Sequence, residues 1–176
     1  MREIISLLLP MLFPVLMGIL LLIIRPLKNR KLINIYTGVV LAVSLVLVMN
    51  LLSLPEKEMV LFYVTQSLPI AVKADLTGKL FLLMISIVWI CAGFYSFSYM
   101  EKEAHPRRYF GFYLITLGIL VGLGISGNLI TMYAFYELLT IVSFILVIHT
   151  QSRESVMAAL KYLLYSFFGA YMALFG

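Results

Sequence analysis

The chain has 176 residues, of which 63% are hydrophobic and only 12% are charged, and its mean hydropathy is +1.07. One core of a water-soluble domain of this length cannot bury so much apolar surface, so the composition excludes that class. The formal net charge of +5 does not indicate nucleic-acid binding, because the basic residues lie in short connections between apolar runs. We therefore expect a membrane protein with no nucleic-acid partner.

The apolar residues form unbroken runs of about 20 residues, the length that a helix needs to cross a bilayer. Strands of membrane barrels instead alternate apolar and polar residues. We predict an all-α integral membrane fold of about six transmembrane helices in a single membrane domain over residues 1–176. The approximate spans are 4–24, 32–54, 76–99, 109–125, 129–148 and 156–175.

The first run carries Pro10 and Pro14, which a membrane helix tolerates when neighbours satisfy the freed carbonyls. It is longer than the core of a signal peptide and ends at Arg25 without a small-residue cleavage site, so we expect a retained span. Between the second and third spans, MVLFYVTQ and LPIAVKAD predict two short extended segments that can pair as an extramembrane β-hairpin. Where the third span begins, Asp75 and Lys79 have the spacing of an ion pair, with the acid at the helix N-terminus.

Lysine and arginine are unevenly divided between the two sides of the predicted bundle. The more basic side is expected to be cytoplasmic, which places the N-terminus outside. Eight basic residues fall on that side, Arg25, Lys28, Arg30, Lys31, Lys102, Arg107, Arg108 and Arg153, against Arg2, Lys57 and Lys73 on the other.

Several residues within the spans have ordinary structural interpretations. Gly111, Gly118 and Gly122 in the fourth span are typical of close helix packing. Cys91 is expected to be a buried small hydrophobe, because no second cysteine forms a disulfide or metal motif with it. Tyr171, like several other tyrosines, is expected at the membrane interface.

Glu137 is the most informative residue, because a charged group in the middle of a membrane helix costs about 2.5 to 3.5 kcal/mol on insertion scales. It lies about ten residues into the fifth span, roughly 15 Å from its outer end. Tyr133, Thr140 and Ser143 extend a polar stripe along the same helical face. Burial favours the neutral carboxyl and a nearby cation favours the carboxylate, so this face is a candidate proton or cation site. The structural alternative is a protonated or paired glutamate that only holds helices together.

Lys161 is the second charge inside a span, five or six residues into the sixth, with Tyr165 one turn later. At that depth its ammonium group can still reach the interface, so snorkelling remains the alternative to a role in ion movement. The short connection between the fifth and sixth spans makes them antiparallel neighbours, but the depths of Lys161 and Glu137 differ by about two turns. A water-bridged relay is therefore favoured over a direct ion pair.

These residues carry a resemblance to a known family. NLITMYAFYELLTIVSFILVIH followed by SVMAALKY resembles the segment around the key glutamate of the antiporter-like subunits of respiratory complex I, membrane-bound hydrogenases and multi-subunit sodium/proton (Mrp) antiporters. Upstream, ADLTGKLFLLM is similar to the start of their third helix, and RRYFGFYLITLGILVGLGISGNL to their fourth. The resemblance covers most of the chain from Asp75 onward.

The resemblance implies that Glu137 corresponds to the essential membrane glutamate of the family and Lys161 to its sixth-helix lysine. It also implies proton or sodium translocation within a multi-subunit complex of the NADH-quinone oxidoreductase, hydrogenase or cation antiporter type, in the plasma membrane of a prokaryote. The expected partners are the other membrane subunits. Members have about fourteen helices, with a lysine on a broken seventh helix. We therefore expect the N-terminal part of such a protein, whether truncated, encoded by a split gene or incompletely determined in sequence. The alternative is a structural or assembly subunit without its own ion pathway.

A redox site within the chain is not expected. His105 lies in a connection and His149 at a helix end, so no pair of histidines within the spans is available to ligate haem. We expect no cofactor and no metal, and at most a membrane component of an ion-translocating oxidoreductase. A quinone site is left open, because aromatic residues and glycines suffice to form one.

Overall fold

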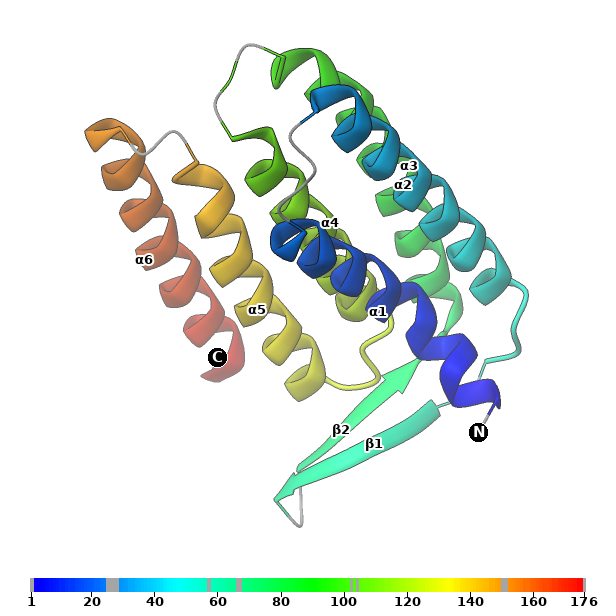
Figure 1. The fold of residues 1–176 in the computed structure, drawn as a ribbon. Coiled ribbons are helices and arrows are strands. Elements are labelled where there is room, and N and C mark those ends of the chain that lie inside the picture. The colour runs from blue at the N-terminus through cyan, green and yellow to red at the C-terminus, as the bar shows by residue number, and fades with distance from the viewer. Residues whose placement is uncertain are drawn as a thin grey trace.

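The computed structural model describes residues 2–24, 29–56, 58–65, 68–101, 103, 105–149 and 152–175. In these residues it contains six helices and one two-stranded hairpin, which confirms the predicted all-α fold with a small β element (Figure 1). The elements in chain order are α1 (Arg2–Ile23), α2 (Arg30–Leu52), β1 (Glu58–Thr65), β2 (Leu68–Lys73), α3 (Leu76–Tyr99), α4 (Pro106–Gly124), α5 (Leu129–Val147) and α6 (Arg153–Phe175).

The helices run up and down a bundle, with the hairpin at the end where α2 finishes and α3 starts (Figure 1). Helix α4 occupies the centre, because it packs against α1, α2, α3 and α5. Phe110, Leu114 and Val121 of this helix are at most 1% exposed. Helices α5 and α6 lie side by side at one edge of the bundle (Figure 1). The antiparallel hairpin is tied to the bundle by a bridge between Val72 and Ser126.

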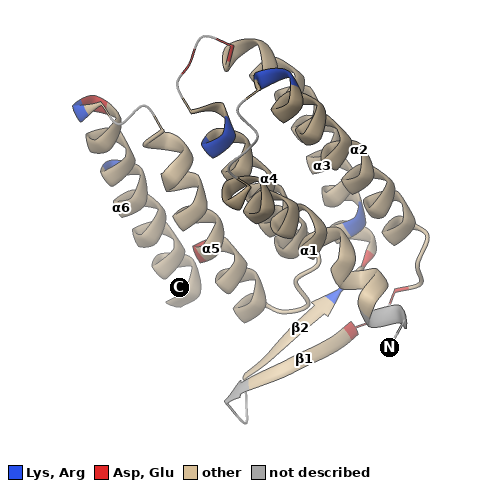
Figure 2. Cartoon of the chain, viewed as in Figure 1, with Lys and Arg blue, Asp and Glu red and all other residues tan. Residues whose placement is uncertain are grey.

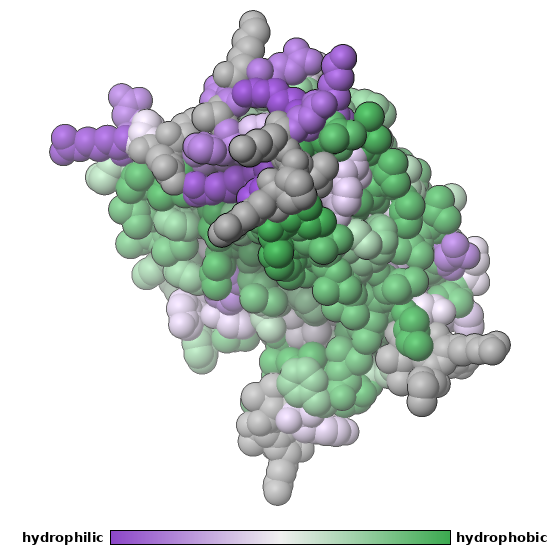
Figure 3. Space-filling view, in the orientation of Figure 1, coloured by the Kyte–Doolittle hydropathy of each residue, from purple (hydrophilic) through white to green (hydrophobic). Residues whose placement is uncertain are grey.

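Five helices in the described part of the chain are long and apolar enough to cross a membrane: α1, α2, α3, α5 and α6. Helix α4 falls outside this set, since its 19 residues begin with Pro106, Arg107 and Arg108. Its crossing of the membrane, and the side on which the N-terminus lies, stay predictions. Hydrophobic side chains cover the middle of the visible face, and hydrophilic ones gather toward the upper end (Figure 3).

One expectation about burial was wrong. Cys91 is exposed on α3 instead of being buried. A span that is apolar on all sides gives no periodicity from which its inward face can be read, so burial of a single small residue does not follow from sequence.

The predicted ion pair at the start of α3 was also wrong. Asp75 is the N-cap of α3, where its Oδ1 accepts a hydrogen bond of 2.8 Å from the Gly78 backbone N–H. Its other oxygen lies 3.8 Å from the Lys73 ammonium group. Lys79 instead donates to the backbone carbonyl of Leu54. Capping and the open end of another helix thus provide better partners than the residue four positions away.

Basic side chains cap the C-terminal ends of three helices. The last carbonyls of a helix lack partners within it, and they carry partial negative charge that attracts cations. The three contacts join Lys79 to Leu54 after α2, Arg30 to Met100 and Glu101 after α3, and Arg107 to Ile24 and Leu22 at the end of α1. Arg30 and Arg107, which the sequence indicated only as markers of membrane orientation, therefore also connect neighbouring helices.

Close approach of α1 and α4 depends on glycine. A Cβ atom added to Gly18 of α1 would lie 2.6 Å from the backbone oxygen of Gly111 on α4. A Cβ atom on Gly118 would likewise meet the Met11 oxygen at 2.6 Å. Backbone atoms of a packed helix cannot move aside as the end of a flexible side chain can. Gly118 is thus confirmed as a packing position, as are Gly111 and Gly122, whose added Cβ atoms would meet the Leu22 and Phe135 side chains.

We expect Gly18→Ala to destabilise the fold by about 1 to 3 kcal/mol, because the added methyl group separates α1 from α4. Gly169→Ala in α6 is the matched control, since nothing lies within 4 Å of its added Cβ. The control gains helix propensity and should be neutral or slightly stabilising. Thermal unfolding of the purified full-length proteins in detergent measures both, and equal stability of the two variants would contradict the role given to Gly18.

Candidate functional site

Glu137 lies in the middle of α5, as the ninth of the 19 residues counted from Leu129. Helix α5 carries an acidic segment halfway along its length, while most other charges lie toward the ends of the elements (Figure 2). The Oε1 atom of Glu137 is buried and has no hydrogen-bond partner in the described part of the chain. A buried carboxyl oxygen without a partner costs free energy, which a proton or an ion can relieve.

Two tyrosines accompany this carboxyl group. Tyr133, one turn earlier on α5, interacts with Glu137 through its hydroxyl group. The Tyr133 ring in turn contacts the ring of Tyr171 on α6, with centroids 6.4 Å apart. Tyr171 was expected only as an interfacial aromatic. The signal that could have placed it here is the antiparallel pairing of the last two helices, which brings late residues of α6 against early residues of α5.

The other members of the predicted polar stripe behave differently. Thr140 is 2% exposed, and its hydroxyl donates to the Tyr136 carbonyl at 3.1 Å. The Ser143 hydroxyl lies 2.6 Å from the Leu139 carbonyl and 2.9 Å from the Tyr162 hydroxyl of α6. Thr140 is thus satisfied within its own helix, whereas Ser143 links α5 to α6.

Lys161 is exposed on α6 and forms no hydrogen bond or ion pair with the residues that the structure describes. The cross-helix contacts of Tyr133 with Tyr171 and of Ser143 with Tyr162 set the register of α5 and α6. They place Glu137 level with about residue 167, so Lys161 lies roughly 9 Å away along the helix axis. The structure therefore does not bring the two charged groups together, and Tyr165, which is 71% exposed, does not join Glu137 either.

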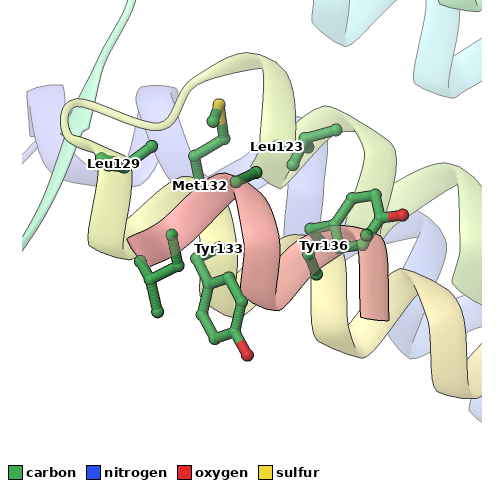
Figure 4. Close-up of a pocket in the computed structure, with 9 residues that line it drawn as sticks. Leu123, Leu129, Met132, Tyr133 and Tyr136 are labelled. Atoms are coloured by element: carbon green, nitrogen blue, oxygen red, sulfur yellow. The ribbon is translucent and has the colours of Figure 1, made fainter. Parts of the chain in front are cut away.

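An apolar pocket of about 310 Å³ opens beside Tyr133, between the end of α4 and helices α5 and α6 (Figure 4). Its walls are nearly all aliphatic or aromatic. They comprise Leu123 of α4, Leu129, Met132, Tyr133 and Tyr136 of α5, and Gly169, Ala170, Ala173 and Leu174 of α6. The Glu137 site thus has an apolar space on the side of α5 where the helix begins.

These features define a multi-pass helical membrane protein with an ionisable group embedded in one span. Residues 62–110 match a family model described as the N-terminus of NADH-ubiquinone oxidoreductase (complex I) chain 5. Residues 126–176, which include Glu137 and Lys161, match the model of the transmembrane region of NADH:quinone oxidoreductase and Mrp antiporter proteins. The chain belongs to the complex I and Mrp antiporter superfamily.

Curated relatives agree with this family. The chain is 29% identical over 163 residues to a Na(+)/H(+) antiporter subunit of Bacillus subtilis (strain 168), covering 90% of this chain and 32% of that protein. It is 29% identical over 135 residues to a probable K(+)/H(+) antiporter subunit of Rhizobium meliloti (strain 1021), covering 74% of this chain and 14% of that protein. The chain therefore spans about a third or less of the length of these relatives.

The fold is also similar to a solved structure, that of the membrane-bound sulfane sulfur reductase, an archaeal respiratory membrane complex. The TM-score is 0.71 at 16% sequence identity, and the match covers 97% of this chain and 35% of that one. At this identity the likeness establishes the fold alone.

The Ser143–Tyr162 contact should contribute measurably to the pairing of α5 with α6. We expect a double-mutant cycle of Ser143→Ala and Tyr162→Phe to give a coupling energy of about 0.6 kcal/mol, the average for hydrogen bonds between membrane helices. Tyr165→Phe is the control, because the Tyr165 hydroxyl has no partner in the described residues. The unfolding free energies of the full-length variants in detergent give the coupling energy. The control cycle pairs Ser143→Ala with Tyr165→Phe. Equal coupling energies in the two cycles would contradict the Ser143–Tyr162 contact.

Proposed function

We propose that this chain forms part of a pathway that moves protons or sodium ions across a membrane, with Glu137 as the group that takes up and releases the proton. The observation that carries the proposal is the buried, unpartnered Oε1 of Glu137 halfway along a helix apolar enough to span the bilayer. Ionisable groups in such positions are rare, because each one costs free energy unless it has a partner or a function.

Tyr133 makes this carboxyl group suited to exchange. A phenol hydroxyl can donate a hydrogen bond to a carboxylate and can accept one from a carboxylic acid. Because Tyr133 interacts with Glu137, both protonation states keep a neighbour when the proton leaves or returns. Thr140 supports the site differently, because its own hydrogen bond within α5 keeps its hydroxyl from competing for Glu137.

Lys161 is proposed as the second relay group, acting on Glu137 through its charge and through water. The separation of roughly 9 Å along the axis excludes a direct contact in this arrangement. The Ser143 and Tyr162 hydroxyls lie at the level of Lys161 and supply polar atoms between the two helices there. Tyr165 follows Lys161 by one turn on α6 and extends the polar side of that helix.

The relatives support an assembly of several membrane subunits. Those reported above carry the names of sodium/proton and potassium/proton antiporter subunits, and the family models are described by complex I and Mrp antiporters. We propose that this chain works with other membrane subunits in the plasma membrane of a prokaryote. Because the relatives are longer, Glu137 and Lys161 are proposed as one part of a longer pathway.

Glu137→Gln tests the proposal, because it removes the exchangeable charge while keeping the size of the side chain. We expect nearly complete loss of ion translocation by the intact complex in membrane vesicles, with normal assembly. Glu154→Gln in the first turn of α6 is the matched control and should leave both unchanged. If Glu137→Gln assembles and still transports ions, the chain has only a structural or assembly role, which is the alternative function.

Lys161 needs a separate test, since its ammonium group could serve only to anchor α6 at the membrane surface. We expect Lys161→Gln to lower the rate of ion translocation and Lys161→Arg to retain most of it, because the charge is what acts on Glu137. Flux is again measured in vesicles with the intact complex. Equal rates for Lys161→Gln and the unmodified protein would remove Lys161 from the pathway and leave Glu137 in it.

A further inference from the structure

Two hydroxyl groups on the buried face of α2 have no hydrogen-bond partner in the described part of the chain. They are Thr37 Oγ1 and Ser44 Oγ, on side chains that are 0% and 3% exposed. Most other buried serine and threonine hydroxyls in the helices donate to the carbonyl four residues earlier, and Thr131 Oγ1 accepts from the Ala71 backbone N–H. Examples are Ser86 to Leu82, Ser96 to Ala92, Thr116 to Phe112 and Thr140 to Tyr136. The two groups on α2 therefore depart from the pattern that satisfies the rest of the bundle.

Ser44 also lines a small cavity between α2, α3 and α4. The cavity has a volume of about 10 Å³, close to the lower limit for holding one water molecule. Ser86 and Trp89 of α3 supply its other polar side chains, and the remaining lining residues are apolar, among them Leu117 and Val121 of α4. The space thus has room for one small polar ligand and has polar groups on two of its helices.

We infer that this cavity binds a single ordered water molecule that bridges Ser44 of α2 and Ser86 of α3. The Ser86 hydroxyl donates to the Leu82 carbonyl at 2.8 Å, which leaves its lone pairs free to accept a hydrogen bond. The Ser44 hydroxyl has its proton to donate. A water that accepts from Ser44 and donates to Ser86 makes two hydrogen bonds, within the two to four of buried waters.

Trp89, the third polar side chain of the cavity, is held in place by contacts with α4. Trp89 Nε1 donates to the Tyr113 carbonyl at 3.2 Å, and the Tyr113 hydroxyl donates to the Trp89 carbonyl at 2.5 Å. Their rings stack with centroids 5.1 Å apart. This reciprocal contact holds α3 against α4 beside the cavity. The water then links α2 to that pair of helices, whereas Glu137 lies on α5.

A structure of the full-length protein in its complex, at a resolution that shows ordered waters, tests the inference directly. We expect density within hydrogen-bond distance of both Ser44 Oγ and Ser86 Oγ, and its loss in Ser44→Val, where the side chain fills the space. An empty cavity with the Ser44 hydroxyl turned onto the Val40 carbonyl would overturn the inference.

Thermal stability of the same full-length protein gives an independent readout. Ser44→Ala should lower the melting temperature, because it removes a hydrogen bond to the water. Thr37→Val is the matched control: it replaces a second unpartnered hydroxyl of α2, outside this cavity, with a side chain of the same shape, and should be neutral or stabilising. Ser44→Ala that is as stable as the unmodified protein would overturn the bridging water.

A double-mutant cycle separates the bridge from a simple loss of packing. Ser44 and Ser86 have no direct hydrogen bond with each other, so only a shared ligand couples their hydroxyl groups. We expect the loss of stability in the combined Ser44→Ala and Ser86→Ala variant to be smaller than the sum of the two single losses, because either one already disrupts the bridge. Strictly additive losses would overturn the inference.

Discussion

Inside a bilayer no solvent water is available to backbone and side-chain polar groups, so each must find its partner within the protein. The described bundle follows this constraint closely. Hydroxyls on helices bond to the carbonyl one turn earlier, as Ser86 and Thr140 do. Basic side chains close the carbonyl ends of α1, α2 and α3. Against that background, Glu137 Oε1 and Ser44 Oγ stand out as unpartnered atoms, and our proposals give them a proton or ion and a water molecule, respectively.

The scaffold explains why the carboxyl group is where it is. Glycines let α1 and α4 approach closely, and α4 in turn provides the surface on which α5 packs. A Cβ atom on Gly122 of α4 would collide with the Phe135 ring of α5, so this glycine also sets the distance between those two helices. Helix α5, which carries Glu137, is thereby held against α4, and Tyr133 beside Glu137 contacts Tyr171 of α6.

Apolar runs were enough to predict the position of the six helices and the hairpin in the described part of the chain, because span length is read locally from the sequence. The position of Glu137 in the middle of a span also followed from sequence, since one charge in an apolar run is visible without a structure. The partner of Lys79, the exposure of Cys91 and the place of Tyr171 did not follow. Each depends on how one helix is rotated against another, and uniformly apolar helices carry little periodic signal for that rotation.

The Glu137 site and the Ser44 cavity differ in whether their polar groups can change charge. Glu137 carries a group whose charge can change, and Tyr133 can serve either protonation state. Ser44 and Ser86 carry only neutral hydroxyls, enclosed by apolar side chains in a space for one water. A neutral site of that size can hold a ligand in place but cannot gain or lose charge near neutral pH. The proposed ion site therefore lies on the helix pair α5 and α6, whereas the proposed water site lies between α2, α3 and α4.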